Sequence, residues 1–194
     1  MVVVKKVPAL VLLVIIAGPQ LQACAPAVVA GAGTGAVVAH DKRTVGAFID
    51  DATIETRAKS RVLNEKNLED AHINVTSING VVLITGEVPS EQARTMALEK
   101  IRGINGVRRT VNEMRVAPAT TFGSRTKDTW LTGKVKTALI ANERLDSTRI
   151  KVVTENKVVY LMGLITQSEG QSAADSARKV KGVTRVVKLF EYTD

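Results

Sequence analysis

The chain carries the same sequence pattern twice, about 77 residues apart. The matched stretches are 51–63 with 128–140, 73–86 with 150–163, and Gly106 with Gly182. The offset is 77 in the first two stretches and 76 at the glycines, so the second copy is one residue shorter in between. Two copies, each long enough to build a small core of its own, indicate a duplicated domain rather than a solenoid of many short repeats.

Each copy opens with a predicted amphipathic helix. Apolar residues recur every fourth position, at Ile54, Ala58 and Val62 in the first copy and at Leu131, Val135 and Leu139 in the second. This spacing gives a helix with one apolar stripe. Asp51 and Asp128 stand just before these stripes and are predicted to be the N-caps, because a short acidic side chain can accept hydrogen bonds from the first free N–H groups of a helix.

The rest of each copy predicts two strands, a helix and a last strand. The expected elements are strands at 73–76 and 150–154, strands at 81–85 and 158–162, helices at 90–102 and 168–179, and strands at 107–116 and 183–192. Asn79-Gly80 suits a tight hairpin turn. A right-handed crossover then places the third strand parallel to the second. We therefore predict an α+β fold of two tandem αββαβ domains, each with a three-stranded mixed sheet covered on one face by two helices.

Residues 1–23 have the layout of a secretory signal peptide. Lys5 and Lys6 precede an apolar run at 7–17, which is too short to span a bilayer because a spanning helix needs about 20 residues. The only cysteine follows in Leu21-Gln22-Ala23-Cys24, which resembles the lipobox of bacterial lipoproteins. That resemblance implies that Cys24 is the first mature residue and carries acyl chains such as palmitate. The alternative is an ordinary cleaved signal followed by a chance cysteine.

The composition beyond the signal indicates a tether and two domains. We predict a signal peptide at 1–23, a lipidated Cys24 with its tether at 24–49, a first domain at 50–117, a linker at 118–127 and a second domain at 128–194. The tether is Gly-rich, small and uncharged. With no second cysteine, a disulfide framework is excluded.

The two copies resemble the BON domain, which has the order αββαβ. The shared marks are glycines after the second strand, at Gly86 and Gly163, and before the third, at Gly106 and Gly182. With the lipobox and tether, essentially the whole chain is similar to the dual-BON lipoproteins of the DolP (YraP) family. The resemblance implies a lipid anchor in the outer membrane, facing the periplasm. It also implies a role in envelope stress and cell division, and binding of anionic phospholipid of the phosphatidylglycerol or cardiolipin class through the second BON domain.

Catalytic chemistry is not indicated. The two histidines, His40 and His72, have no Cys, His or carboxylate at metal-ligand spacing, and no nucleophile or phosphate-binding motif is present. We therefore predict that the chain is not an enzyme and uses no cofactor or metal. A secreted lipoprotein does not meet the chromosome, so its basic charge does not indicate a nucleic-acid partner.

The second copy differs from the first in charge and in its tryptophan. Residues 50–116 hold ten Lys/Arg and ten Asp/Glu, whereas residues 124–194 hold thirteen and eight, a net charge of +5. Trp130 occupies the place of Thr53 and lies off the apolar stripe, so we expect it to be exposed. Tryptophan favours the bilayer interface. We predict a phospholipid-binding site of Trp130, Leu131, Lys134 and Lys127.

Two other interpretations stay open at this point. The indole of Trp130 would instead pack against the first domain or the segment 120–122, and the basic face would then be solvated without a partner. Alternatively, the chain is an adaptor that binds an envelope protein assembly, through the edges of its sheets or the apolar hairpin strand at 158–162.

Overall fold

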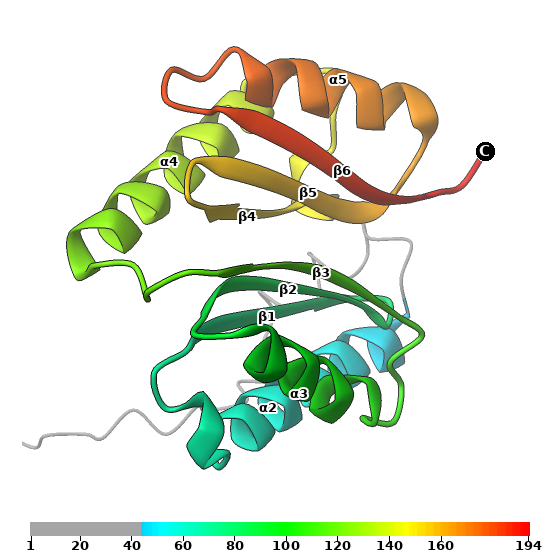
Figure 1. Ribbon diagram of the computed structural model, residues 1–194. Coiled ribbons are helices and arrows are strands. Elements are labelled where there is room, and N and C mark those ends of the chain that lie inside the picture. The colour runs from blue at the N-terminus through cyan, green and yellow to red at the C-terminus, as the bar shows by residue number, and fades with distance from the viewer. Residues whose placement is uncertain (1–43) are drawn as a thin grey trace, which may run out of the picture. The chain divides into compact units, whose positions relative to one another are not determined.

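The computed structural model describes residues 44–194, which all belong to one compact unit (Figure 1). The predicted signal peptide, Cys24 and most of the predicted tether lie outside the described residues. In the part of the chain that is described, no helix is both long and apolar enough to cross a membrane.

The predicted αββαβ order is confirmed in both repeats. The first repeat contains α2 (Val45–Leu63), η1 (Lys66–Leu68), β1 (His72–Ile78), β2 (Val81–Val88), α3 (Glu91–Arg102) and β3 (Arg109–Val116). The second contains α4 (Phe122–Ile140), η2 (Ser147–Arg149), β4 (Lys151–Glu155), β5 (Val158–Ile165), α5 (Gln167–Arg178) and β6 (Arg185–Tyr192). The short 3₁₀ turns η1 and η2 lead into the hairpins and were not expected.

Each repeat forms the predicted three-stranded mixed sheet. The strand orders are β1-β2-β3 and β4-β5-β6, with the central strand antiparallel to the first and parallel to the last. The two helices of each repeat cover one face of its sheet (Figure 1). Ile54 and Ile84 lie in the resulting core of the first repeat, and Val135 and Leu161 in that of the second.

The first helix of each repeat begins earlier than predicted, and the predicted N-caps are wrong. Thr44 caps α2 by accepting from Ala47 N, and Thr121 caps α4 by accepting from Ser124 N. The last residues of the predicted tether, from Val45, and of the predicted linker, from Phe122, are therefore helical. Threonine is also a favourable N-cap, because its hydroxyl accepts from a free N–H group of the first turn. Each helix therefore gains nearly two turns before Asp51 or Asp128.

These two aspartates instead hold the hairpin turn of their own repeat. Both are 5% exposed. Asp51 accepts from Ser77 Oγ at 2.6 Å, Asn79 N at 2.7 Å and Gly80 N at 3.0 Å. Asp128 correspondingly accepts from the backbone N–H groups of Asn156 and Lys157, both at 2.9 Å. The turn residues have positive φ, for example 50° at Asn79 and 63° at Lys157, so a buried carboxylate stabilises a costly backbone conformation.

The two sheets pack against each other through the faces that their helices leave open (Figure 1). One apolar cluster contains residues of both repeats: Ile78, Val81, Leu83, Tyr160 and Met162. The contact explains why β2 is buried along its whole length, since its two faces meet α2 and α3 on one side and β5 on the other.

Buried carboxylates accept hydrogen bonds across this contact in both directions. Glu155 of the second repeat accepts from Asn74 Nδ2 at 3.0 Å and Thr85 Oγ1 at 3.2 Å. Glu87 of the first repeat accepts from Asn156 Nδ2 at 2.6 Å. Because unpaired buried carboxylates are costly, these bonds specify one docking of the repeats.

Candidate functional site

The outer side of α4 exposes three large apolar side chains. Phe122 is 80% exposed, Trp130 67% and Ile140 70%. At about 100° per residue, Phe122 and Ile140 lie at the same angle around the helix, roughly 80° from Trp130. The stripe between them carries only uncharged residues, namely Thr126, Gly133 and Thr137. The exposure predicted for Trp130 is confirmed, and it argues against the alternative in which the indole packs against the first domain or the segment 120–122.

The Trp130 ring lies beside a cation. Lys134 Nζ is 4.0 Å from the centroid of the ring, within cation–π range. The same ammonium donates to the carbonyl oxygen of Lys181 at 2.8 Å, which fixes it next to the indole. Lys127 is exposed one turn before Trp130. The structure therefore brings Trp130, Lys134 and Lys127 onto one side of α4, as predicted, whereas contact with lipid stays a prediction.

Leu131 does not belong to this surface, and its place in the predicted site is wrong. Its side chain is 4% exposed. It faces Gly182, where an added Cβ would lie 3.5 Å from Leu131 Cδ1. The reason is geometric: Leu131 stands on the apolar stripe of α4, about 100° from Trp130, and that stripe faces the core.

Phe122 is an exposed residue of α4 that the sequence interpretation missed. With Asp128 as the predicted N-cap, Phe122 falls in the predicted linker at 118–127. The signal was Thr121, which precedes Phe122 and caps the helix. With Thr121 as the N-cap, Phe122 becomes the first residue of α4 and lies on its exposed side.

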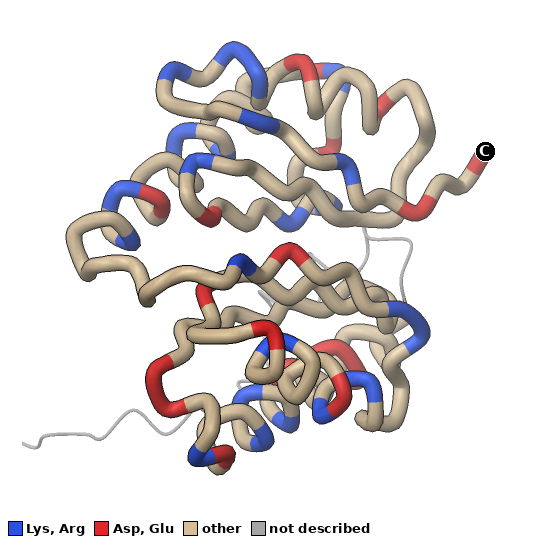
Figure 2. The backbone as a smooth tube through the Cα atoms, in the orientation of Figure 1, with Lys and Arg blue, Asp and Glu red and all other residues tan. Residues whose placement is uncertain are grey.

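The charge of α4 adds to the basic character of this side. The helix contains four Lys/Arg and one acidic residue, Asp128, which is buried and bound to its turn. In contrast α2 contains three Lys/Arg and three Asp/Glu. Positive segments accordingly dominate α4 in Figure 2, and the turn between α5 and β6, with Lys179 and Lys181, is also basic.

The hairpin strand at 158–162 is not exposed, so the alternative in which this strand binds a protein is wrong. Its central residues Val159, Tyr160, Leu161 and Met162 are at most 3% exposed. They fill the core of the second repeat and the contact between the sheets. An adaptor surface formed by this strand would require the repeats to separate.

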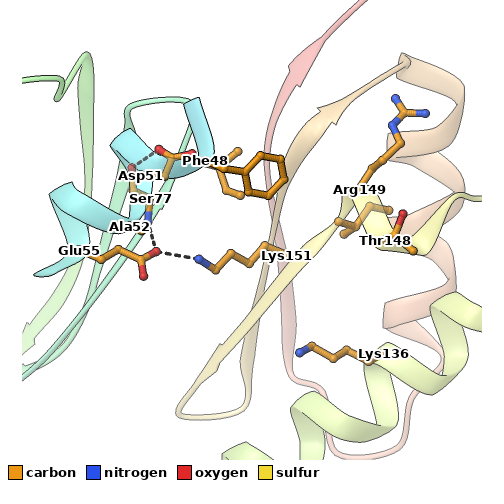
Figure 3. Close-up of a pocket in the computed structure, with 11 residues that line it drawn as sticks. Phe48, Asp51, Ala52, Glu55, Ser77, Lys136, Thr148, Arg149 and Lys151 are labelled. Atoms are coloured by element: carbon orange, nitrogen blue, oxygen red, sulfur yellow. Dashed lines mark hydrogen bonds and ion pairs between the residues drawn. The ribbon is translucent and has the colours of Figure 1, made fainter. Parts of the chain in front are cut away.

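A hollow of about 320 Å³ lies where the two repeats meet (Figure 3). Phe48 of α2 and Lys136 of α4 extend into it from opposite sides (Figure 3). Glu55 Oε1 closes one wall by accepting from Lys151 Nζ at 2.7 Å and from Ser77 N at 2.8 Å. The Glu55–Lys151 pair joins the two repeats, and the Ser77 hydroxyl in the same wall donates to Asp51, which holds the hairpin turn of the first repeat. Within residues 44–194, no cluster of three or more His, Cys, Asp or Glu is placed to hold a metal ion.

Comparison with known proteins identifies the domains. The BON domain family matches residues 50–118 and 127–194. The chain is 39% identical to outer membrane lipoprotein DolP of Haemophilus influenzae over 175 residues, covering 90% of this chain and 91% of that protein. It is 35% identical to the 21 kDa hemolysin of Actinobacillus pleuropneumoniae, covering 78% and 79%, and 28% identical to osmotically-inducible protein Y of Escherichia coli, covering 78% and 77%.

The chain is therefore a protein of two tandem BON domains. It belongs to the DolP (YraP) family of outer-membrane lipoproteins, and the family, fold and outer-membrane localisation predicted from the sequence are confirmed. The acyl chains at Cys24 lie outside the described residues and stay a prediction, as does the absence of catalysis.

Proposed function

We propose that this lipoprotein uses α4 of its second BON domain to bind the surface of a bilayer that contains anionic phospholipid. The observation that carries the proposal is the exposed Trp130 with Lys134 4.0 Å from its ring. An indole partly covered by an ammonium has an apolar body, a wet N–H and a positive neighbour, which suits the boundary between acyl chains and phosphates. Phosphatidylglycerol and cardiolipin supply the negative charge.

The magnitudes indicate a weak site that depends on the anchor. Each Lys near an anionic surface adds roughly 1 kcal/mol, and each large apolar side chain roughly 1.5–3 kcal/mol. Lys127 and Lys134 with Phe122 and Trp130 thus give roughly 5–8 kcal/mol, before the cost of ordering. Acyl chains at Cys24 would hold the protein at the membrane and present α4 at an effective concentration on the order of mM. The anchor then provides attachment, and α4 responds to lipid composition.

The test is binding of the mature chain, made soluble by Cys24→Ser, to vesicles of phosphatidylcholine with and without phosphatidylglycerol or cardiolipin. We expect binding only to the anionic vesicles, and a loss of about tenfold or more for both Trp130→Ala and Lys134→Glu. The control is Arg57→Glu, because Arg57 occupies in α2 the place of Lys134 in α4.

Arg57→Glu changes the total charge by the same amount as Lys134→Glu, yet it should leave binding nearly unchanged. Equal losses for the two charge reversals would mean that net charge, not α4, governs attraction to the vesicle. Wild-type binding that ignores anionic lipid would remove the proposal and leave a protein-binding role in the envelope. Crosslinking to an envelope protein that persists in Trp130→Ala would support that second role.

A further inference from the structure

Two adjoining hollows lie where the end of α4 meets α5. Their volumes are about 590 Å³ and 500 Å³. They share four lining residues, Asn142, Arg144, Ser176 and Lys179, which define what we call the α4–α5 hollow. All four belong to the second repeat, so the hollow does not depend on how the repeats dock.

The floor of the hollow presents hydroxyl groups with free hydrogens. Asn142 Nδ2 donates to Ser172 Oγ at 3.0 Å and to Ser176 Oγ at 2.8 Å. Each serine hydroxyl therefore accepts one bond and keeps its own hydrogen to donate. Within residues 44–194, neither hydroxyl has an acceptor, unlike Thr129, whose Oγ1 donates to the carbonyl oxygen of Arg125 four residues before. A ligand for these groups must supply acceptor oxygens.

The rim of the hollow supplies positive charge. The side chains of Arg144 and Lys179 are exposed, and neither is hydrogen-bonded to a carboxylate of the described residues. Asp175 is already engaged: its pKa is lowered by the hydrogen bond from Gln171 and then by that from Arg178, at 2.7 Å. Glu143 is the acidic side chain that remains on the rim. Two hydroxyl donors with Arg and Lys favour an anionic, oxygen-rich group such as phosphate.

The first repeat fills the matching place with its own ion pair. Glu65 corresponds to Asn142 and Lys100 corresponds to Ser176. Lys100 Nζ lies 2.5 Å from Glu65 Oε2, so both charges are satisfied within the protein. In the second repeat a neutral amide and a hydroxyl stand there instead. Lys179 there interacts with Asp175 through its charge alone, and Arg144 has no hydrogen bond to a carboxylate within residues 44–194.

The α4–α5 hollow begins on the side of α4 that carries Trp130. At about 100° per residue, Lys134 and Ala141 lie roughly 40° and 20° from Trp130, and Ala141 is about 17 Å further along the axis. Ala141 lines the hollow, and Lys134 Nζ is bonded to the carbonyl oxygen of Lys181, two residues after Lys179. We propose that the α4–α5 hollow binds the phosphate of a phospholipid headgroup while Trp130 enters the same bilayer surface. This inference rests on the proposed function and assigns it a headgroup subsite.

The test replaces the neutral pair of the second repeat by the ion pair of the first, in Asn142→Glu/Ser176→Lys. This double variant leaves the net charge unchanged, and the first repeat shows that the fold accommodates the pair. The soluble Cys24→Ser chain is titrated with monomeric dihexanoyl phosphatidylglycerol and followed by amide NMR, and its binding to phosphatidylglycerol vesicles is measured by sedimentation. Ser176→Ala is a milder second variant, in case the double variant is unstable.

For the parent chain we expect shifts at the amides of Asn142, Arg144 and Ser176. The double variant should lose these shifts and bind vesicles about five- to tenfold more weakly, since hydrogen bonds to a charged group are lost. Trp130→Ala should weaken vesicle binding but keep the shifts, because a monomeric lipid does not need the indole to enter a bilayer.

Three outcomes would overturn the inference. The first is shifts confined to the turn around Trp130. The second is a double variant that binds vesicles as tightly as the parent chain does. If Trp130→Ala still loses vesicle binding in that case, the headgroup subsite is wrong but the proposed function stands. The third is inorganic phosphate that shifts the same amides at the same concentration as the lipid, which would make the hollow a site for a free anion.

Discussion

The two repeats have the same interior but opposite surfaces on their first helix. Asp51 and Asp128 hold equivalent hairpin turns by equivalent hydrogen bonds. On the outer side, Thr53 in α2 gives way to Trp130 in α4, and Asp50 gives way to Lys127. Duplication thus kept the groups that hold the fold together and changed the groups that face solvent. The difference locates the candidate membrane contact in the second repeat, where an exposed indole and a positive helix coincide.

The shared interior can be tested most strongly at its two aspartates. Asp51→Ala and Asp128→Ala each leave two turn N–H groups without their carboxylate acceptor, which costs roughly 2–4 kcal/mol of unfolding free energy. Asp51→Ala should cost more, since Asp51 also accepts from Ser77 Oγ at 2.6 Å. Urea unfolding followed by circular dichroism measures both.

The matched controls are Asp50→Ala and Lys127→Ala, one residue before each aspartate and exposed to solvent. They should change stability little. If Asp51→Ala and Asp128→Ala were as mild as these controls, the turn-holding role assigned to both aspartates would be wrong.

The divergent surface can be tested by exchanging charges. Lys127→Glu/Lys134→Glu reverses the two charges that the proposed function places near lipid phosphates, and it should weaken binding to anionic vesicles by about 30-fold or more. The reciprocal change, Asp50→Lys/Thr53→Trp, gives α2 the groups of α4 and should strengthen binding. Sedimentation at low and at high salt measures both, and high salt should reduce the difference because it screens charge. A reciprocal variant that binds no better would show that α2 cannot reach the bilayer.

The contact between the sheets offers a comparison of two buried glutamates with opposite pKa shifts. Burial raises the pKa of Glu155, the negative charge of Glu87 adds to the rise, and the hydrogen bond from Asn74 opposes it. Burial also acts to raise the pKa of Glu87, but hydrogen bonds from Asn156, Thr120 and Arg115 outweigh it and leave that pKa lowered. The ionised form is thus disfavoured at Glu155 and favoured at Glu87.

The pH dependence of stability follows from these directions. A raised native pKa costs stability as the pH rises above the usual glutamate range, whereas a lowered pKa contributes stability there that is lost on acidification. Glu155→Gln should therefore be more stable than the wild type at pH 7, and Glu87→Gln less stable. Both differences should shrink toward pH 4 in urea unfolding. Differences of the same sign at pH 7 would contradict the assignment.

The smallest expected effect concerns Tyr160, which takes the place of Leu83 between the sheets. Its hydroxyl donates to Glu113 Oε2 at 3.1 Å, and burial together with Glu113 raises its pKa to about 12. Tyr160→Phe removes this bond but keeps the ring, so it should cost about 1 kcal/mol of unfolding free energy. Leu83→Ala, a matched core change, should cost about 2–5 kcal/mol. If Tyr160→Phe cost as much unfolding free energy as Leu83→Ala, the single hydrogen bond of the hydroxyl would stabilise the fold as much as a whole core side chain, contrary to this expectation.

The sequence predicted the elements because their signals are local, and failed where the answer depends on distant groups. The spacing of Leu131, Val135 and Leu139 fixed both the buried stripe of α4 and the exposure of Trp130. The same spacing should have removed Leu131 from the candidate site. The role of Asp128 was missed because its partners, Asn156 and Lys157, lie 28 and 29 residues away.

The packing of sheet on sheet left a signal that was not used. The run Val81–Ile84 is apolar without alternation, which is typical of a strand covered on both faces. The polar bonds across the contact, such as Asn156 to Glu87, had no such signal, because which polar groups meet depends on the docking itself. The α4–α5 hollow could not be predicted from the sequence either. It depends on Asn142 and Ser176 meeting in space where the first repeat has the Glu65–Lys100 pair.

The reciprocal glutamate bonds between the sheets have a consequence for how the protein is held at a membrane. Because Glu87 and Glu155 each accept from the opposite repeat, the two BON domains turn together. If α4 binds lipid as proposed, the first repeat is therefore held in one orientation relative to the membrane instead of swinging about a hinge. Binding of lipid by the second BON domain would thereby determine which face of the first BON domain points into the periplasm.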